Sequence, residues 1–212
     1  MYLSKLIDQV LEDNKSALLG RQFYGTLANK LNHAFFEHEN FTFIIKKLPV
    51  IWDNSYAISG LYDQETNIKV ITLNFSQYSK KFDLNLNNWE GFKFNVSQVC
   101  QHEKIHQLQW QHRDTSAFTQ ELIDFRTKAK NKRLEEKMYL ADPDEVDAYA
   151  HDIAMEIKLH YGNQDPYLIL KNINKKRKIW SYNYYKNTFK GDNWYNIRRR
   201  LLLKIYMWLP HV

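Results

Sequence analysis

The sequence predicts an α+β fold, with helices toward both ends of the chain and a small sheet between them. Two patterns indicate it. Apolar residues recur at helical spacing over residues 2–38 and again after residue 96, whereas residues 41–75 contain short runs rich in β-branched and aromatic residues. With 212 residues, of which 44% are hydrophobic and 15% aromatic, the chain can bury a full core, so disorder is excluded.

The composition excludes two further classes of protein. A single cysteine, Cys100, cannot form a disulfide framework and gives no sign of an oxidising compartment. No apolar run approaches the roughly 20 residues that a bilayer-spanning helix needs. The start, MYLSKLIDQVLEDNK, carries acids where a signal peptide needs an apolar core. We therefore expect a cytoplasmic protein that has no membrane partner.

The first part of the chain predicts helices followed by strands. The helical pattern of residues 2–38 is interrupted near Gly20 and Gly25, which indicates two helices. The runs FTFIIKKL, SYAISGLY and NIKVITLNF then predict a small antiparallel sheet. The second and third runs are close enough to form a hairpin through residues 63–67, which leaves one strand at an edge. Residues 76–95 look irregular.

Helices are expected over the rest of the chain. One spans residues 96–113, and a charged helix follows at 116–138. The next begins with Asp142 as the cap and Pro143 at the first helical position. Its apolar stripe comprises Val146, Tyr149, Ala150, Ile153 and Ile157. From these elements we expect residues 1–165 to form one domain, and residues 166–212 to form a basic, aromatic, helical extension packed on it.

Residues 102–106 read His-Glu-Lys-Ile-His and match the HExxH pattern. On a helix, His102 and His106 share one face, so their imidazoles can bind one zinc ion at about 2.0–2.1 Å. Glu103 lies about 100° around the helix, within reach of the water on the metal. Zinc lowers the pKa of that water to about 7. We expect Glu103 to take its proton as a general base and later to deliver it to a leaving amine.

A catalytic zinc ion normally takes a third protein ligand, and two residues compete for that role. We favour Glu145, which lies on the helix whose start is marked by Asp142 and Pro143. His112 is the alternative, but Gln109 stands where such a spacing requires a glycine to break the helix. On an unbroken helix His112 lies about 9 Å beyond His106 and about 120° off its face, too far to share an ion.

Glu145 also has a purely structural explanation, because Asp142 and Glu145 have the spacing of a capping box at a helix start. Asp144 and Asp147 are less favoured ligands from the same turn. For an oxyanion-stabilising group near the site, Tyr149 and His151 are both suitable, and the sequence does not choose between them.

HEKIH followed by a helix that carries EVDAYA at 145–150 resembles the gluzincin group of HExxH metallopeptidases. The resemblance covers roughly residues 41–160 and implies a zincin-like fold, zinc held by His102, His106 and Glu145, Glu103 as general base, and hydrolysis of peptide bonds. The SGLYD and IKVITLN runs resemble the hairpin of such proteins, whose edge strand holds an extended peptide by main-chain pairing. The sequence also resembles small proteins encoded by tailed phages. For a phage protein, the expected cytoplasm would be that of the host cell.

Two features favour a different class, a non-catalytic binding or assembly protein with a vestigial HExxH. Gln107, Gln109 and Gln111 make the helix unusually polar just after the histidines. The chain also has a net charge of +6, and its basic excess gathers in an aromatic C-terminal segment that suits nucleic acid or a protein subunit as a partner. Cys100 is expected to be a buried packing residue.

Overall fold

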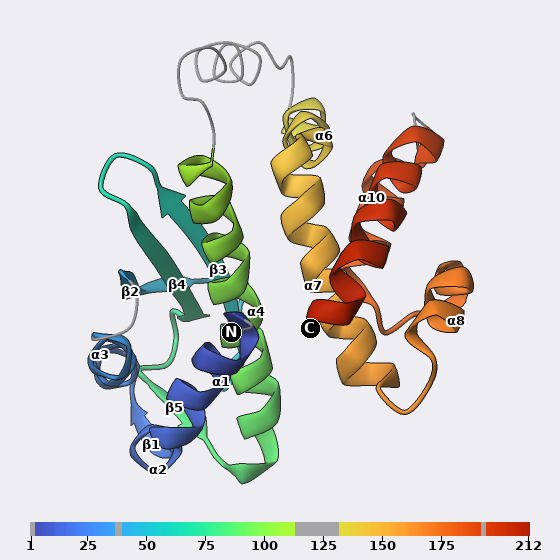
Figure 1. Cartoon of the computed structure of the whole chain (residues 1–212). Helices are drawn as coiled ribbons and strands as arrows, with labels where there is room; N and C mark the ends of the chain where they lie inside the picture. The colour runs from blue at the N-terminus through green and yellow to red at the C-terminus, as the bar shows by residue number, and fades with distance from the viewer. Residues whose placement is uncertain (1–2, 37–39, 113–131, 192–193) are drawn as a thin grey trace. The chain divides into compact units, whose positions relative to one another are not determined.

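The computed structural model describes residues 3–36, 40–112, 132–191 and 194–212 (Figure 1). The chain divides into two compact units, Met1–Leu108 and Gln109–Val212. Helix α4 (Leu86–Gln111) contains the boundary between them. The predicted division after residue 165 stays a prediction. None of the helices in these ranges is both long and apolar enough to cross a membrane.

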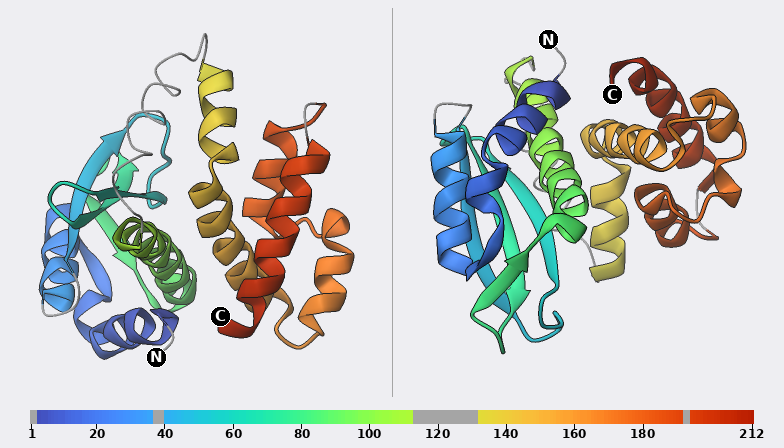
Figure 2. Two further views of the ribbon diagram at one scale, coloured as in Figure 1. Left: turned by 45° about the horizontal axis from the view of Figure 1, so that its top comes forward. Right: turned by 90° about the horizontal axis from the view of Figure 1, so that it is seen from below.

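The first unit combines helices with two small sheets. Its elements in chain order are α1 (Leu3–Asp13), α2 (Lys15–Leu18), β1 (Gly20–Phe23), α3 (Tyr24–Phe35), β2 (Phe41–Leu48), β3 (Tyr56–Asp63), β4 (Ile68–Ser76), β5 (Lys81–Leu84) and most of α4. The strands β2, β4 and β3 form one sheet in that order, and β1 pairs with β5 in the other. The views of Figures 1 and 2 place α3 on the β2 side of the strands and α4 on the β3 side.

The prediction of a purely antiparallel sheet was wrong for one pair of strands. β3 and β4 form the predicted antiparallel hairpin, and Asn67 at its turn adopts a φ of 56°. Two reversals of the chain make β4 run in the same direction as β2, and β4 inserts between β2 and β3. The β2–β4 pair is therefore parallel, with Phe41 opposite Lys69.

Residues 76–95 were wrongly expected to be irregular. They contain β5, which pairs with β1 so that Gly20 lies opposite Leu84, and α4 already begins at Leu86. Gly20 has a φ of 109°, which only glycine adopts readily, so the predicted break there is confirmed. The partner of β5 lies far away in the sequence, and for that reason the local pattern did not show the strand.

The two edges of the three-stranded sheet differ. On the β2 edge, the Asn32 side chain of α3 donates to the Phe43 carbonyl at 2.9 Å and accepts from the Phe43 N–H at 2.7 Å, as a neighbouring strand would. Lys46 and Lys47 on β2 are also exposed. On the other edge, no strand among the described residues pairs with the outer side of β3. Among the described residues, Asn32 therefore occupies part of the β2 edge, whereas the outer side of β3 has no strand partner.

The core of the first unit joins the sheet to α3 and α4. It includes Phe43 and Ile71 from the strands, Leu31 from α3, and Phe92 and Cys100 from α4, each 2% exposed or less. Complete burial of Cys100 in this cluster confirms that it is a packing residue.

The second unit is helical apart from short connections. It contains α6 (Lys132–Ala141), α7 (Pro143–Tyr161), α8 (Pro166–Lys171), the 3₁₀ turn η1 (Ile173–Lys175), α9 (Trp180–Thr188), α10 (Trp194–Trp208) and η2 (Leu209–His211). Its core is formed mainly by α7, α9 and α10, and α10 packs along α7 (Figure 1). Most of the predicted charged helix, 116–138, lies outside the described residues.

The predicted start of α7 is confirmed. The Asp142 carboxylate accepts from the Asp144 N–H at 2.9 Å, and Pro143 occupies the first turn. Val146, Ala150 and Ile153 from the predicted stripe are buried.

The C-terminal aromatic residues divide into a buried group and an exposed group. Tyr182, Tyr185 and Phe189 belong to the core of this unit, whereas Trp180 and Tyr195 are exposed. Fewer rings than the sequence suggested are therefore available to stack on a nucleic-acid base, and the nucleic-acid or subunit partner stays a prediction.

Replacing Asp142 with alanine is expected to lower the free energy of unfolding by about 1 kcal/mol, because the first turn of α7 loses its cap. Urea unfolding without added metal measures this change. Asp165→Ala is the matched control: Asp165 caps the exposed, six-residue α8, so a smaller loss is expected there. Unchanged stability of Asp142→Ala would contradict the assigned role of the cap.

Candidate metal centre

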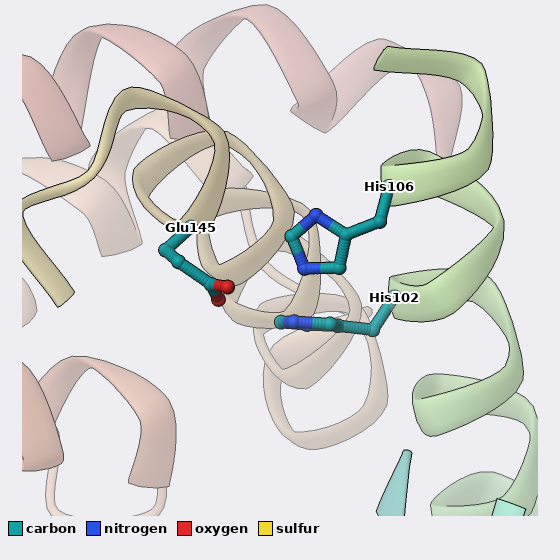
Figure 3. A group of neighbouring side chains, drawn as sticks. All are labelled: His102, His106 and Glu145. Atoms are coloured by element: carbon teal, nitrogen blue, oxygen red, sulfur yellow. The ribbon is translucent and has the colours of Figure 1, made fainter. Parts of the chain in front are cut away.

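Helix α4 presents two imidazoles on one face. The ring centroids of His102 and His106 are 4.8 Å apart, with their planes at 73°. Figure 3 shows both rings projecting from successive turns of α4 toward the same side. His102 is 8% exposed and His106 is half-buried. The predicted helix and its shared histidine face are therefore present.

Glu145 on α7 supplies a third potential ligand. One ring nitrogen from His102, one from His106 and a carboxylate oxygen of Glu145 all lie within 4.8 Å of one another (Figure 3). Within the part of the chain that the structure describes, these residues make up a His-His-Glu group that could hold a metal ion. Glu145 is only 6% exposed.

Glu103 points toward the sheet of the first unit. A Cβ atom built on Gly60 of β3 would lie 2.5 Å from Glu103 Cγ and 2.7 Å from Cδ, so this side chain rests directly on the backbone of the edge strand. Glu103 is 5% exposed. Its carboxylate is therefore held between α4 and β3, about 100° around the helix from His102.

Gln107, one turn after Glu103, anchors the same side of α4 to the hairpin. Lys69 Nζ donates to Gln107 Oε1 at 3.0 Å, and Gln107 Nε2 donates to Asn67 Oδ1 at 2.7 Å. Asn67 Oδ1 also accepts from the Tyr62 hydroxyl at 3.0 Å. Lys69 is completely buried, with its ammonium group 4.7 Å from the centre of the Phe41 ring. This network fixes the β3–β4 turn to the helix that carries the histidines.

The remaining candidate ligands are placed elsewhere. Asp147 accepts from Trp208 Nε1 and pairs with Lys204, each at 3.1 Å, so α10 engages its carboxylate. His112 is exposed just past the last residue of α4 and is not in the His-His-Glu group. Asp144 donates its N–H to the Asp142 cap.

A capping box is not needed to give the Asp142 N–H a hydrogen-bond partner. The Asp142 N–H, which the box would satisfy through Glu145, donates to the Tyr139 carbonyl at 3.1 Å.

The charge of Glu145 acts on two tyrosines of its own unit. Burial, followed by the nearby charges of Glu145 and Asp152 among others, raises the pKa of the Tyr185 phenol well above its usual value. Burial and a hydrogen bond to Glu136, together with the charges of Glu136 and Glu145, also raise the pKa of Tyr184.

Tyr149 and His151 both contact aromatic rings of the second unit. The Tyr149 ring lies 5.2 Å from that of Tyr185. The His151 ring meets Trp208 edge to face, with centroids 4.9 Å apart. Tyr149 follows Glu145 by about one turn on the same face of α7, whereas His151 lies about 120° away from it. An oxyanion-stabilising role for either residue stays a prediction.

Sequence reasoning missed Gly60 and Lys69. Gly60 sits inside the SYAISGLY run, and a lone glycine in a strand pattern often marks the close approach of another group. That signal was available. Lys69 gave none, because a lysine within NIKVITLNF reads as a solvent-facing residue of an alternating strand.

Comparison of the chain with models of protein families, with curated proteins and with solved structures finds no match. The resemblance to gluzincins therefore rests on the motif, and the geometry of the site must carry the functional argument.

Removal of either histidine is expected to abolish metal binding, because two ligands cannot replace the chelate formed by three. After both proteins are loaded with zinc as the probe metal, elemental analysis should find less than a tenth of the wild-type content in His102→Ala. Zinc at 100 times its Kd should add about 2.7 kcal/mol to wild-type stability, and a chelator should reverse the gain. His112→Ala is the matched control and should bind like the wild type. Loss of zinc from that variant would contradict the assignment.

Proposed function

We propose that the protein is a zinc-dependent peptidase in which His102, His106 and Glu145 hold the metal and Glu103 acts as the general base. The observation that carries the proposal is the arrangement on α4. Two imidazoles share one face, while the intervening glutamate lies against an edge strand that has no partner strand among the described residues.

The donor set suits zinc. Two imidazole nitrogens and one carboxylate oxygen are the three protein ligands typical of a catalytic zinc site, which keeps a fourth position for water or substrate. In a tetrahedral site with bonds of about 2.0–2.2 Å, ligand atoms are about 3.3–3.6 Å apart. The donor atoms of His102, His106 and Glu145 all lie within 4.8 Å of one another.

A hydrogen bond at the end of α4 supports Glu145 as the third ligand. Gln109 is the first residue of the second unit. Its Nε2 donates to the Asp144 carbonyl at 3.2 Å. Gln109 follows His106 by three residues on the same continuous helix, and Asp144 directly precedes Glu145. This bond gives a role to one of the glutamines that made the helix unusually polar.

The chemistry assigned to the site is hydrolysis of a peptide bond. A zinc ion held there supplies a Lewis acid that polarises a carbonyl group and makes water acidic enough to react near neutral pH. Glu103 accepts a proton from the attacking water and later delivers it to the leaving nitrogen. Its low exposure and its contact with Gly60 keep the carboxylate in one position for both transfers.

The edge strand indicates the class of substrate. An extended peptide can add to the outer side of β3 by main-chain hydrogen bonds, which depend little on its side chains. Glu103 touches Gly60 in the second half of this strand, so the base lies beside the place where such a peptide would pair. The β2 edge, which Asn32 occupies at Phe43, does not offer the same pairing there.

Glu103→Gln is expected to bind one zinc per chain and to lose about 10²–10⁴-fold in kcat, because an amide cannot accept the proton of water. A set of internally quenched peptides measures hydrolysis, and elemental analysis measures zinc. A zinc-loaded wild type that cleaves none of the peptides would favour the non-catalytic alternative. Equal activity of wild type and variant would remove Glu103 from the mechanism.

Glu145→Gln is expected to weaken zinc binding at least tenfold, because a neutral amide replaces a charged ligand. Asp147→Asn is the matched control from the same helix. It removes the same charge, but α10 already engages Asp147, so zinc affinity should stay at the wild-type value. Competition with a chromophoric chelator measures both affinities. Equal affinities for the two variants would rule out Glu145 as a ligand.

A further inference from the structure

We infer that Gly60 is a positioning residue for Glu103: its missing side chain leaves the space in which the base lies against the edge strand. The catalytic part of this inference rests on the proposed function, whereas the geometric part does not. Gly60 touches neither a metal ligand nor, in the proposed mechanism, the reacting atoms, and it acts only through Glu103.

The nearest contacts at Gly60 all belong to one side chain. The three heavy atoms nearest to a Cβ at position 60 are Oε1, Cγ and Cδ of Glu103, all within 2.7 Å. Real Cβ atoms do not approach other heavy atoms this closely. A single methyl group at Gly60 and the present position of the Glu103 carboxylate therefore exclude each other.

The register of the sheet explains the direction of this contact. Gly60 lies opposite Ile71 of β4, and Ile71 is buried in the core beneath α4. Ile58 and Tyr62, two residues away on either side, face the same way and are half-buried and buried. Large side chains thus stand before and after position 60 on this face of the strand, and the glycine leaves a gap between them, in which the Glu103 carboxylate lies.

The backbone conformation at position 60 does not require a glycine. Positive φ values occur at Gly20 and Gly191 but not at Gly60, so any residue could adopt its conformation. Gly60 also differs from the other five glycines of the chain. A Cβ at Gly20, Gly25, Gly91 or Gly191 would meet nothing within 4 Å, and one at Gly162 would meet the backbone of its own helix. Of these six glycines, Gly60 is the one at which the side chain of another residue fills the space that a Cβ would take.

A clash with one flexible side chain has a specific consequence. The strand at position 60 is held on one side by β4, whereas Glu103 can rotate about its own bonds. The fold and the histidine face are therefore expected to survive Gly60→Ala, with Glu103 displaced. A displacement of about 1 Å in a catalytic group costs on the order of 10²-fold in rate.

The first experiment compares Gly60→Ala with Gly91→Ala, which adds the same methyl group on α4 in open space. Gly60→Ala should keep one zinc per chain and lose about 10²-fold in kcat on the quenched peptides, with KM changed less than threefold. Gly91→Ala should retain wild-type zinc content and kcat. Wild-type kcat in Gly60→Ala, or loss of zinc together with activity, would overturn the positioning role.

The second experiment needs no activity. Gly60→Ala is introduced into the wild type and into Glu103→Ala, and thermal unfolding is measured for all four proteins. The substitution should lower the Tm by about 2–4 °C when Glu103 is present and should not lower it when position 103 is alanine. An equal fall in both backgrounds would show that the methyl group clashes with something else and would overturn the inference. If the Tm values follow the expected pattern but the wild type hydrolyses no peptide, the peptidase proposal is rejected and the contact between Gly60 and Glu103 stands.

Discussion

The direction in which α4 faces is set by contacts on the side of the helix next to its histidines. Glu103 rests on Gly60, and Gln107 is hydrogen-bonded to Lys69 and Asn67, so two successive turns are tied to the β3–β4 hairpin. A helix is stiff over this distance, and the imidazoles one turn apart take their orientation from these anchors. The polar residues around the motif therefore orient the helix, which is a different role from binding an ion.

The same contacts connect the proposed chemistry to the proposed substrate. The hairpin that receives Gln107 begins with β3, the strand whose outer side has no neighbouring strand among the described residues. Lys69 is unusual in this network because it is fully buried, where an isolated charge is costly. The Gln107 carbonyl and the face of Phe41 both compensate its charge, so the lysine joins helix, hairpin and core at one point.

Local signals in the sequence predicted the elements that carry the site, but long-range pairing escaped them. The HEKIH spacing placed His102 and His106 on one face, and Asp142 with Pro143 marked the start of α7, since both patterns depend on a few neighbouring residues. The β1–β5 pair and the parallel β2–β4 pair join distant segments, so no local period reveals them. Lys69 was missed for a related reason: its burial depends on Gln107, which lies far along the chain.

The contact of Asn32 with the β2 edge limits how copies of this chain could pair through the three-stranded sheet. A sheet with two bare edges can recruit a copy at each and grow without end into a fibre. Here Asn32 already satisfies the Phe43 backbone, and two lysines follow on the same strand. Within the described three-stranded sheet, pairing through β3 alone would end once two molecules had joined edge to edge, because the outer side of β3 would then be used in both. The same asymmetry that leaves β3 without a strand neighbour thus works against open-ended stacking of copies through this sheet.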